Sequence, residues 1–325
     1  RSKERSACWM SRIISVLLAT VFALSVMGCG TKDTKEQDAY RQYGITCMES
    51  GKYEDAVKAF QNALGESIGH IGEKELDICF YKAKAQALDG KTKDALATYN
   101  AIIKYNKDAR AYYLRGDLYM DMGEEKKGRA DFESAVQQGK KNYEIYIGIY
   151  ESLSRHEKKD EGQKYLSAAM EIKGDKPEDE LYKGRISYLL GENKDAISYL
   201  EKAKEHKQML ASYYLGLAYD ANGDSDKAKK CIAEYIKSGV ATSYDLYELG
   251  MQEMQDGNYK NALTYFNSGL ELEKVPNKQN LMKSAIAAYE YSGDFDSAKK
   301  MMKEYLKAYP DDEEAKHENT FLETR

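Results

Sequence analysis

Apolar residues recur along this chain in pairs of short stretches with helical spacing, and a glycine separates the two stretches of a pair. Residues 244–270 show the pattern clearly. Before Gly257, Leu246 and Leu249 lie on one face of an expected helix. After it, the second stretch places its apolar residues at i, i+3, i+4 and i+7: Tyr259, Ala262, Leu263 and Phe266. One helix pair cannot bury both of its stripes alone, so the pattern predicts a stack of similar pairs.

The residues expected at the turns repeat at a nearly constant interval. Glycine holds seven of the eight positions, which are Gly51, Gly90, Gly123, Arg155, Gly191, Gly223, Gly257 and Gly293. Glycine ends a helix readily because it adopts left-handed backbone angles without a steric penalty. The turns therefore predict eight helix pairs, with Arg155 at the turn of the fourth.

The spacing of small and large residues resembles the tetratricopeptide repeat, a unit of about 34 residues with two helices. The family places small residues at positions 8, 20 and 27, and the first copy here has Gly44, Ala56 and Ala63 at these positions. The resemblance implies an all-α fold, an α-α superhelix of about eight helix-turn-helix repeats. It also implies that the first helix of each repeat lines the concave side of the array.

The resemblance sets the expected repeat boundaries. The copies span about 37–70, 76–108, 109–140, 141–176, 177–208, 209–242, 243–276 and 279–312. Residues 313–325 are expected to form a C-terminal cap. In the fourth copy, Gly148 is expected at position 8 and about two extra residues precede Gly162.

Two substitutions are expected to change stability in opposite directions. Gly128 replaces the alanine expected at a helix contact, and glycine inside a helix is about 1 kcal/mol worse than alanine, so Gly128→Ala should stabilise. Ala262 occupies the same position in the seventh copy, where a larger side chain should overpack the contact.

The N-terminal region has the pattern of a secretory signal. The run 13–27 carries no charge and is too short for a transmembrane helix, which needs about 20 apolar residues. Its end resembles the cleavage motif of bacterial lipoproteins, since Val26, Gly28 and Cys29 match that motif. Met27 departs from it, being bulkier than the usual residue. The alternative is a signal-like anchor that is never cleaved.

The lipoprotein resemblance implies a processing scheme. Residues 1–28 would be removed as the signal peptide, and a lipid on Cys29 would anchor the chain to the cell membrane on its extracytoplasmic side. Residues 29–36 would form a flexible tether. Met10 would make a compact start for such a signal, and whether residues 1–9 are translated stays open.

Charge and composition exclude several functional classes. The whole chain has a net charge of −5, and residues 1–28 contribute +3, so the remainder carries −8. This balance gives no electrostatic footprint for nucleic acid. The histidines, His70, His156, His206 and His317, show no spacing to a nucleophile, and no glycine-rich phosphate loop is present. We therefore expect no enzyme activity and no small-molecule cofactor.

The five cysteines show no metal-binding pattern. None forms a CxxC motif, and no histidine stands at ligand spacing, so no metal site is expected. Cys47, Cys79 and Cys231 fall on apolar stripes, where a free cysteine packs as a small hydrophobic residue. Whether Cys47 and Cys79 form a disulfide stays open.

Aromatic residues recur at positions 5 and 6 of the first helices. The chain has 28 tyrosines, and tyrosine combines a large contact area with a polar end. The expected partner-binding residues are Phe80, Tyr81, Tyr113, Tyr146, Tyr182, Tyr213, Tyr214 and Tyr247. The alternative is that these rings only fill contacts between adjacent helices.

These features predict a non-catalytic scaffold that binds a protein or peptide in a concave, tyrosine-rich groove. Two alternatives remain open: an envelope protein that binds cell-wall strands or carbohydrate on the tyrosines, and an assembly scaffold that uses the convex face. The identity of the partner, the oligomeric state and the envelope layer do not follow from the sequence.

Overall fold

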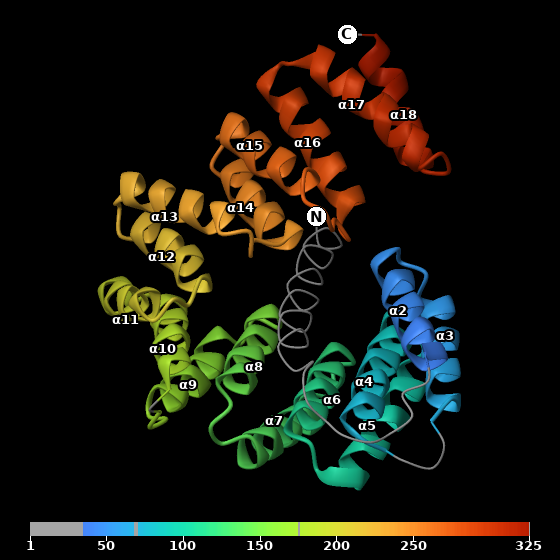
Figure 1. Cartoon of the computed structure of the whole chain (residues 1–325), viewed down its shortest axis with the longest axis vertical. Coiled ribbons are helices and arrows are strands. Elements are labelled where there is room, and N and C mark those ends of the chain that lie inside the picture. Colours follow the sequence, from blue (N-terminus) through green and yellow to red (C-terminus); the bar gives the residue numbers. More distant parts are fainter. Residues whose placement is uncertain (1–34, 68–70, 175, 325) are drawn as a thin grey trace. The chain divides into compact units, whose positions relative to one another are not determined.

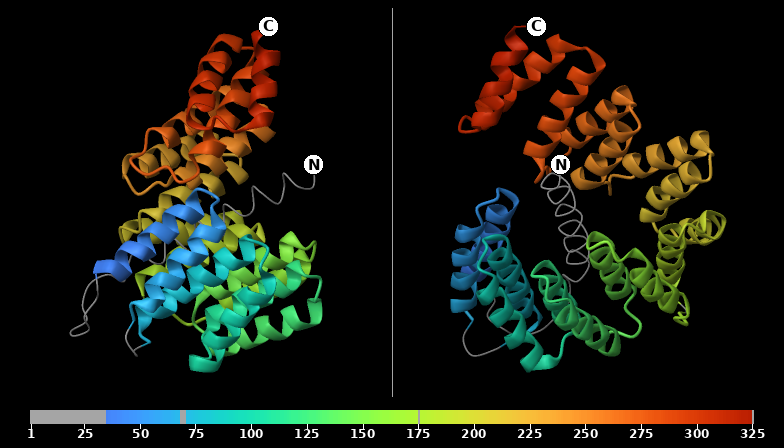
Figure 2. Two further views of the ribbon diagram at one scale, coloured as in Figure 1. Left: turned by 90° about the vertical axis from the view of Figure 1, so that its right-hand side faces the viewer. Right: turned by 180° about the vertical axis from the view of Figure 1, so that it is seen from behind.

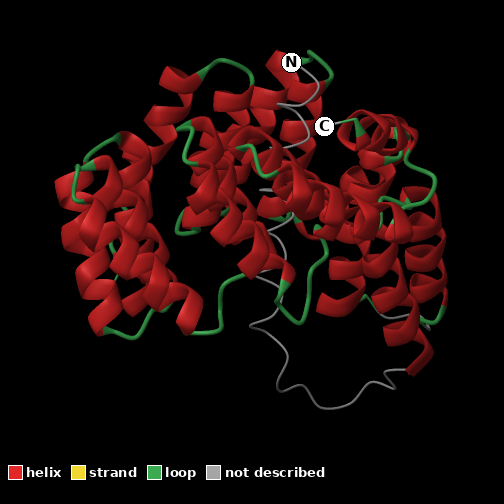
Figure 3. Cartoon of the chain, turned by 90° about the horizontal axis from the view of Figure 1, so that it is seen from above, coloured by secondary structure: helices red, strands yellow, loops and turns green. Residues whose placement is uncertain are grey.

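The computed structural model describes residues 35–67, 71–174 and 176–324. Within these ranges the chain forms seventeen α-helices and no strand (Figure 1, Figure 3). The all-α prediction is therefore confirmed. The expected signal peptide, Cys29 and most of the expected tether lie outside the described residues.

Sixteen of the helices form eight consecutive pairs, each joined by a short turn (Figure 2). The pairs are α2 (Lys35–Glu49) with α3 (Tyr53–Gly65), α4 (Glu73–Leu88) with α5 (Thr92–Asn106), α6 (Ala109–Asp121) with α7 (Glu125–Gln138), α8 (Tyr143–Arg155) with α9 (Lys159–Met170), α10 (Pro177–Leu190) with α11 (Asn193–Glu205), α12 (Leu210–Ala221) with α13 (Ser225–Lys237), α14 (Ser243–Gln255) with α15 (Tyr259–Leu270), and α16 (Lys278–Ser292) with α17 (Phe295–Ala308). A single helix, α18 (Glu313–Glu323), follows the last pair.

The pairs belong to two compact units, which divide between Val240 and Ala241. The first unit holds α2 to α13 and the second holds α14 to α18. In each unit the second helix of a pair packs against the first helix of the next pair. Among the described residues, no helix is long and apolar enough to cross a membrane.

Seven of the predicted turn glycines have left-handed backbone angles, with φ between +70° and +86°. The fourth turn differs from the prediction. Arg155 is the last residue of α8, and Glu157 takes the left-handed conformation at φ +62°. The prediction that Arg155 holds the turn position is therefore wrong by two residues. The sequence carries no signal for the correct residue, because a glutamate and not a glycine stands at position 157.

The packing of small residues explains the shift. In regular pairs the glycine at position 8 faces the side chain 16 residues later, as Gly44 faces Phe60. In the fourth pair, Gly162 instead packs against the backbone of Tyr150. Tyr150 thus holds position 8 of the repeat. Gly148 holds position 6, two positions before the predicted one. The extra residues of this repeat lie in the connection 139–142 before α8, since α8 and α6 both have 13 residues.

The contact between α6 and α7 is unusually close. A Cβ added at Gly128 would lie 2.7 Å from Met120 Sδ and 3.0 Å from the carbonyl oxygen of Gly116. Met120 is 2% exposed and has little room to move. The expectation that Gly128→Ala stabilises the fold considered only helix propensity. At this helix–helix distance the added methyl group would clash with Met120 and with the backbone of Gly116.

The helix α18 closes the second unit. Ala315 and Leu322 of α18 are buried against the cluster around Tyr305. Asp312 caps this helix: its carboxylate accepts from the amide of Ala315 (3.1 Å) and from the Tyr305 hydroxyl (2.5 Å), and it pairs with Lys283 Nζ (2.8 Å). The ammonium of Lys283, followed by the Tyr305 hydroxyl, holds the pKa of Asp312 well below its usual range.

Candidate binding face on the first helices

First helices of successive pairs contact each other at several junctions within the two units. In the first unit α2 contacts α4, α6 contacts α8, and α10 contacts α12, whereas second helices of successive pairs share no comparable contact in the described residues. First helices of successive pairs therefore lie closer together at these junctions than second helices do. We call the surface of α4, α6, α8, α10 and α12 the inner face; the residues that matter here are Tyr81, Lys84, Tyr113, Asp117, Glu151, Tyr182, Arg185, Tyr213 and Tyr214.

Tyr81 on α4 is partly exposed and rests on a packed base. Its ring stacks on Phe60, with centroids 5.5 Å apart, and the guanidinium of Arg41 lies 5.4 Å from the ring centre. Burial raises the pKa of Tyr81 to about 12. The ring is therefore fixed in place before any partner arrives.

Tyr113 on α6 fills a gap that α8 leaves. A Cβ added at Gly148 would lie 2.6 Å from the Tyr113 ring, so the ring packs directly against the glycine backbone. Burial raises the pKa of Tyr113 well above its usual value. The shift of Gly148 by two residues thus places it at position 6, where it accepts an aromatic ring from the preceding repeat.

The other partly exposed tyrosines among the predicted binding residues lie on α10 and α12. Tyr182 stacks on Tyr143 with centroids 5.1 Å apart and planes 9° from parallel. Burial, followed by the charge of Glu144, raises the pKa of Tyr182. Tyr213 and Tyr214 form an edge-to-face pair at 5.1 Å. All three side chains are half-buried, with one part packed and another open to solvent.

Three predicted binding residues are almost fully buried. Phe80, Tyr146 and Tyr247 are 8%, 5% and 8% exposed. Arg110 covers the Phe80 ring at 4.5 Å, and the Tyr146 hydroxyl donates to the carbonyl oxygen of Lys140 at 3.2 Å. These rings mainly hold the array together. Of the eight predicted residues, the five with exposed surface are Tyr81, Tyr113, Tyr182, Tyr213 and Tyr214, and their binding role stays a prediction.

The placement of Tyr146 follows from the same two-residue shift. An α-helix turns by about 100° per residue, so two residues change the direction of a side chain by about 200°. Tyr146 therefore points into the core cluster of α8 and α9 rather than to the inner face.

A row of charged residues on the inner face was missed in the sequence. Position 9 of four successive repeats holds Lys84, Asp117, Glu151 and Arg185. Their spacing of 33 or 34 residues is the signal that could have found them. Asp117 and Arg185 are each only 7% exposed, so they require partners.

Arg185 joins α10 to α8. Its guanidinium lies 3.1 Å from a carboxylate oxygen of Glu151 and 3.5 Å from one of Glu144. The same group lies 5.5 Å from the Tyr214 ring centre on α12. One buried cation therefore connects three consecutive first helices.

A second charged cluster joins α6 to α8. Arg155 forms an ion pair with Asp117 and lies 3.8 Å from Asp121. His156 Nε2 lies 3.2 Å from the same Asp121 carboxylate. Lys84 on α4 faces this cluster, and burial lowers its pKa. The inner face thus carries both signs of charge beside its tyrosines.

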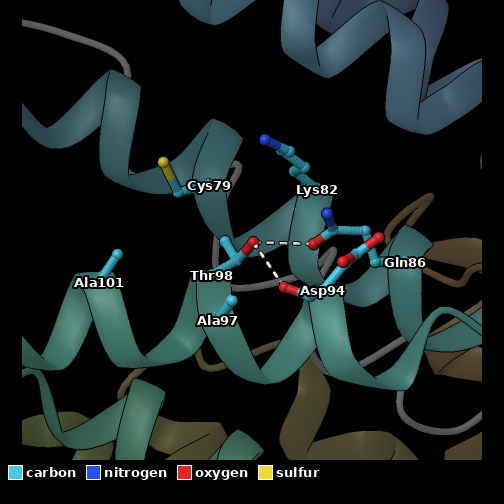
Figure 4. Close-up of a pocket in the computed structure, with 7 residues that line it drawn as sticks. All are labelled: Cys79, Lys82, Gln86, Asp94, Ala97, Thr98 and Ala101. Carbon is cyan, nitrogen blue, oxygen red and sulfur yellow. Dashed lines mark hydrogen bonds between the residues drawn. The ribbon is translucent and has the colours of Figure 1, made fainter.

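The described residues show no candidate metal site. No group of three or more metal-ligating side chains occurs among them. A shallow depression between α4 and α5 contains Thr98, whose hydroxyl donates to Gln86 Oε1 at 2.8 Å, and Cys79 (Figure 4). Burial raises the pKa of the Cys79 thiol, which disfavours the reactive thiolate. Cys47, Cys79 and Cys231 are all free, so Cys47 and Cys79 form no disulfide here.

The fold defines the class: an α-α solenoid of helix pairs with an open inner face. Two family models, both described as tetratricopeptide repeat, match residues 44–103 and 82–143 in one case and 210–238 and 279–312 in the other. Together they match half of the chain. The chain therefore belongs to the tetratricopeptide-repeat proteins, a fold of protein-interaction scaffolds.

Solved structures with the same fold share little sequence with this chain. Yeast Tom70 has 16% identity and a TM-score of 0.50, over 84% of this chain and 59% of that one. A tetratricopeptide repeat protein from Parabacteroides merdae has 12% identity and a TM-score of 0.46, over 78% of this chain and 99% of that one. The pilus biogenesis factor PilW has 16% identity and a TM-score of 0.42, over 76% and 99%. No curated protein matches the chain.

Proposed function

We propose that this protein is a membrane-tethered, non-catalytic scaffold that binds an extended peptide or protein segment on the inner face of its first unit. The observation that carries the proposal is the set of five half-exposed tyrosines on α4, α6, α10 and α12, which are Tyr81, Tyr113, Tyr182, Tyr213 and Tyr214. Tyrosine gives a large contact area and loses little rotamer entropy on binding.

The support beneath these rings favours a binding role. Phe60 supports Tyr81, Tyr143 supports Tyr182, and Tyr213 contacts Tyr235 at 5.3 Å. A ring that is already fixed costs less ordering on binding, so more of its contact energy appears as affinity.

The charged row suggests the chemical character of the partner. Arg185, Glu151 and Asp117 already form ion pairs within the chain. A ligand with a strong single-sign charge would have to break these pairs. We therefore expect a partner segment that is mixed in charge and contributes apolar or aromatic side chains to the tyrosines.

The membrane tether is supported by the sequence alone. Val26, Gly28 and Cys29 match the lipoprotein motif. A lipid on Cys29 would hold the array at the extracytoplasmic surface, where the inner face could retain a partner close to the membrane.

Affinity capture with matched tyrosine variants tests the proposal. The wild-type protein is recovered from detergent-solubilised membranes of its native source, and co-purifying proteins are quantified by mass spectrometry. Tyr214→Ala on the inner face should reduce recovery of the partner at least tenfold, as is typical of an aromatic hot spot. Tyr199→Ala, a half-buried tyrosine on the second helix α11, is the control and should leave recovery unchanged.

The variant Tyr214→Phe separates peptide binding from carbohydrate binding. A peptide groove keeps most of its affinity when only the hydroxyl is removed, whereas a sugar site depends on hydroxyl hydrogen bonds. Equal losses for Tyr214→Ala and Tyr199→Ala, or no loss for either, would contradict binding on the inner face.

A further inference from the structure

The C-terminal end of α8 carries a histidine with two hydrogen-bond acceptors. His156 follows the last residue of the helix, and its Nδ1 lies 2.8 Å from the carbonyl oxygen of Ser152. Its Nε2 lies 3.2 Å from a carboxylate oxygen of Asp121, the last residue of α6. A carbonyl and a carboxylate can only accept hydrogen bonds.

A neutral imidazole cannot satisfy both of these contacts. It carries one N–H group, so its other nitrogen would present a lone pair to an oxygen lone pair. The doubly protonated ring donates at both nitrogens. The geometry at His156 therefore matches the charged form of the ring.

We propose that His156 is a pH-responsive latch between the third and fourth repeats: the charged ring joins the end of α8 to Asp121 of α6, and loss of its proton breaks one of the two contacts. The latch acts between elements of the fold and does not depend on the proposed partner.

The surrounding charges determine the direction of the response. Asp121 and Asp117 face the cluster from α6, Arg155 lies beside the histidine on α8, and Lys84 faces it from α4. The hydrogen bond to Asp121 raises the pKa of His156, and it outweighs burial and the repulsion from Arg155. The C-terminal end of a helix also favours a positive charge.

The sign of the linkage follows. Because the pKa of His156 is higher in the folded chain, its contribution to stability is complete below the unfolded value of about 6.5. The contribution is lost as the pH rises through the folded value. The Asp121 side chain is half exposed, so the expected change in stability is modest.

The latch also lies next to the inner face. Arg155 pairs with both Asp117 and Asp121, and Asp117 is part of the charged row. When the histidine is neutral, Arg155 remains as the cation facing Asp121. The junction of α6 and α8 therefore changes its charge and its contacts as the pH rises through the pKa of His156.

His206 provides a matched control. It also follows the last residue of a helix, α11, but its side chain is exposed. Titration of the histidine ring protons by NMR in the intact protein should place the pKa of His156 above the unfolded value of about 6.5. Asp121→Asn should lower the pKa of His156, because it removes the carboxylate that the charged ring contacts.

Thermal melts give an independent readout. His156→Gln should lower the melting temperature at about pH 5.5, and this loss should shrink by at least about half at pH 8.5, while His206→Gln should show no such dependence. A titration of His156 that Asp121→Asn leaves unchanged, or an equal effect of His156→Gln at both pH values, would overturn the latch. Neither outcome bears on whether the inner face binds a partner.

Discussion

The contact between α6 and α7 makes a testable claim at Gly128. Replacing this glycine by alanine adds one methyl group inside a helix, which by propensity alone should stabilise by about 1 kcal/mol. The structure opposes this gain, because the new Cβ would lie 2.7 Å from Met120 Sδ, 2.9 Å from Met120 Cγ and 3.0 Å from the Gly116 carbonyl oxygen.

The magnitude follows from these distances. Carbon atoms in ordinary contact are about 3.5–4.0 Å apart, so the neighbours would have to move by roughly 0.5–1.3 Å. Met120 is buried, and the Gly116 oxygen belongs to a helix backbone. Overpacking of this kind costs about 1–3 kcal/mol. After the helix gain is subtracted, Gly128→Ala should destabilise by about 0–2 kcal/mol.

Thermal and urea unfolding of matched variants provide the assay. Gly65→Ala is the control, because Gly65 ends α3 and a Cβ there would meet nothing within 4 Å. This control should be neutral or slightly stabilising. Gly128→Ala should melt up to several degrees lower than the wild type.

A double-mutant cycle identifies the cause. Met120→Ala removes the nearest side chain, so Gly128→Ala should cost less in that background than in the wild type. If Gly128→Ala raised the melting temperature as Gly65→Ala does, the close approach of α6 and α7 would be refuted.

Three further predictions test the register, the packing and the tether. Glu157→Gly should stabilise the fold by about 1 kcal/mol, because glutamate at φ +62° is strained. Arg155→Gly should destabilise it by removing the ion pair with Asp117. Unfolding curves with the opposite order of stability would mean that residue 155, and not residue 157, holds the left-handed turn position. Ala262→Leu should cost about 1–3 kcal/mol, since Ala262 is fully buried between α14 and α15; a neutral effect in thermal melts would contradict this packing. Cys29→Ala should release the protein from the membrane or leave an uncleaved precursor, and a mature wild-type N-terminus other than Cys29, measured by mass spectrometry, would exclude the lipoprotein assignment.

Much of the fold could be predicted because each repeat restates the same physical pattern. Small residues at positions 8 and 20 allow two helices to approach, and glycine at the turn supplies the left-handed conformation. Seven turns follow this rule. The fourth does not, because a glutamate, Glu157, holds the left-handed position there.

The candidate site was harder to predict than the fold. The register predicted for α8 was wrong by two residues. It placed Tyr146 at position 6 on the inner face, where the structure has Gly148, and Tyr146 is buried in the core. Phe80 and Tyr247 show a different difficulty, since they occupy the expected repeat positions but neighbouring residues cover them. Repeat position gives the direction of a side chain, whereas exposure depends on the neighbouring repeats.

The charged row shows what a search for aromatic residues overlooks. Lys84, Asp117, Glu151 and Arg185 occupy one repeat position, but two are acidic and two are basic. A search for a patch of one sign does not find them. Their ion pairs appear only when the inner helices are placed side by side.

Site-specific photo-crosslinking in the native membrane tests the central claim most directly. A photoreactive phenylalanine analogue replaces Tyr81 or Tyr214 on the inner face, or Tyr199 on a second helix as the control. Binding on the inner face predicts the same partner adduct from positions 81 and 214, and none from position 199. An adduct from position 199 alone would place the partner on the convex face and contradict the account.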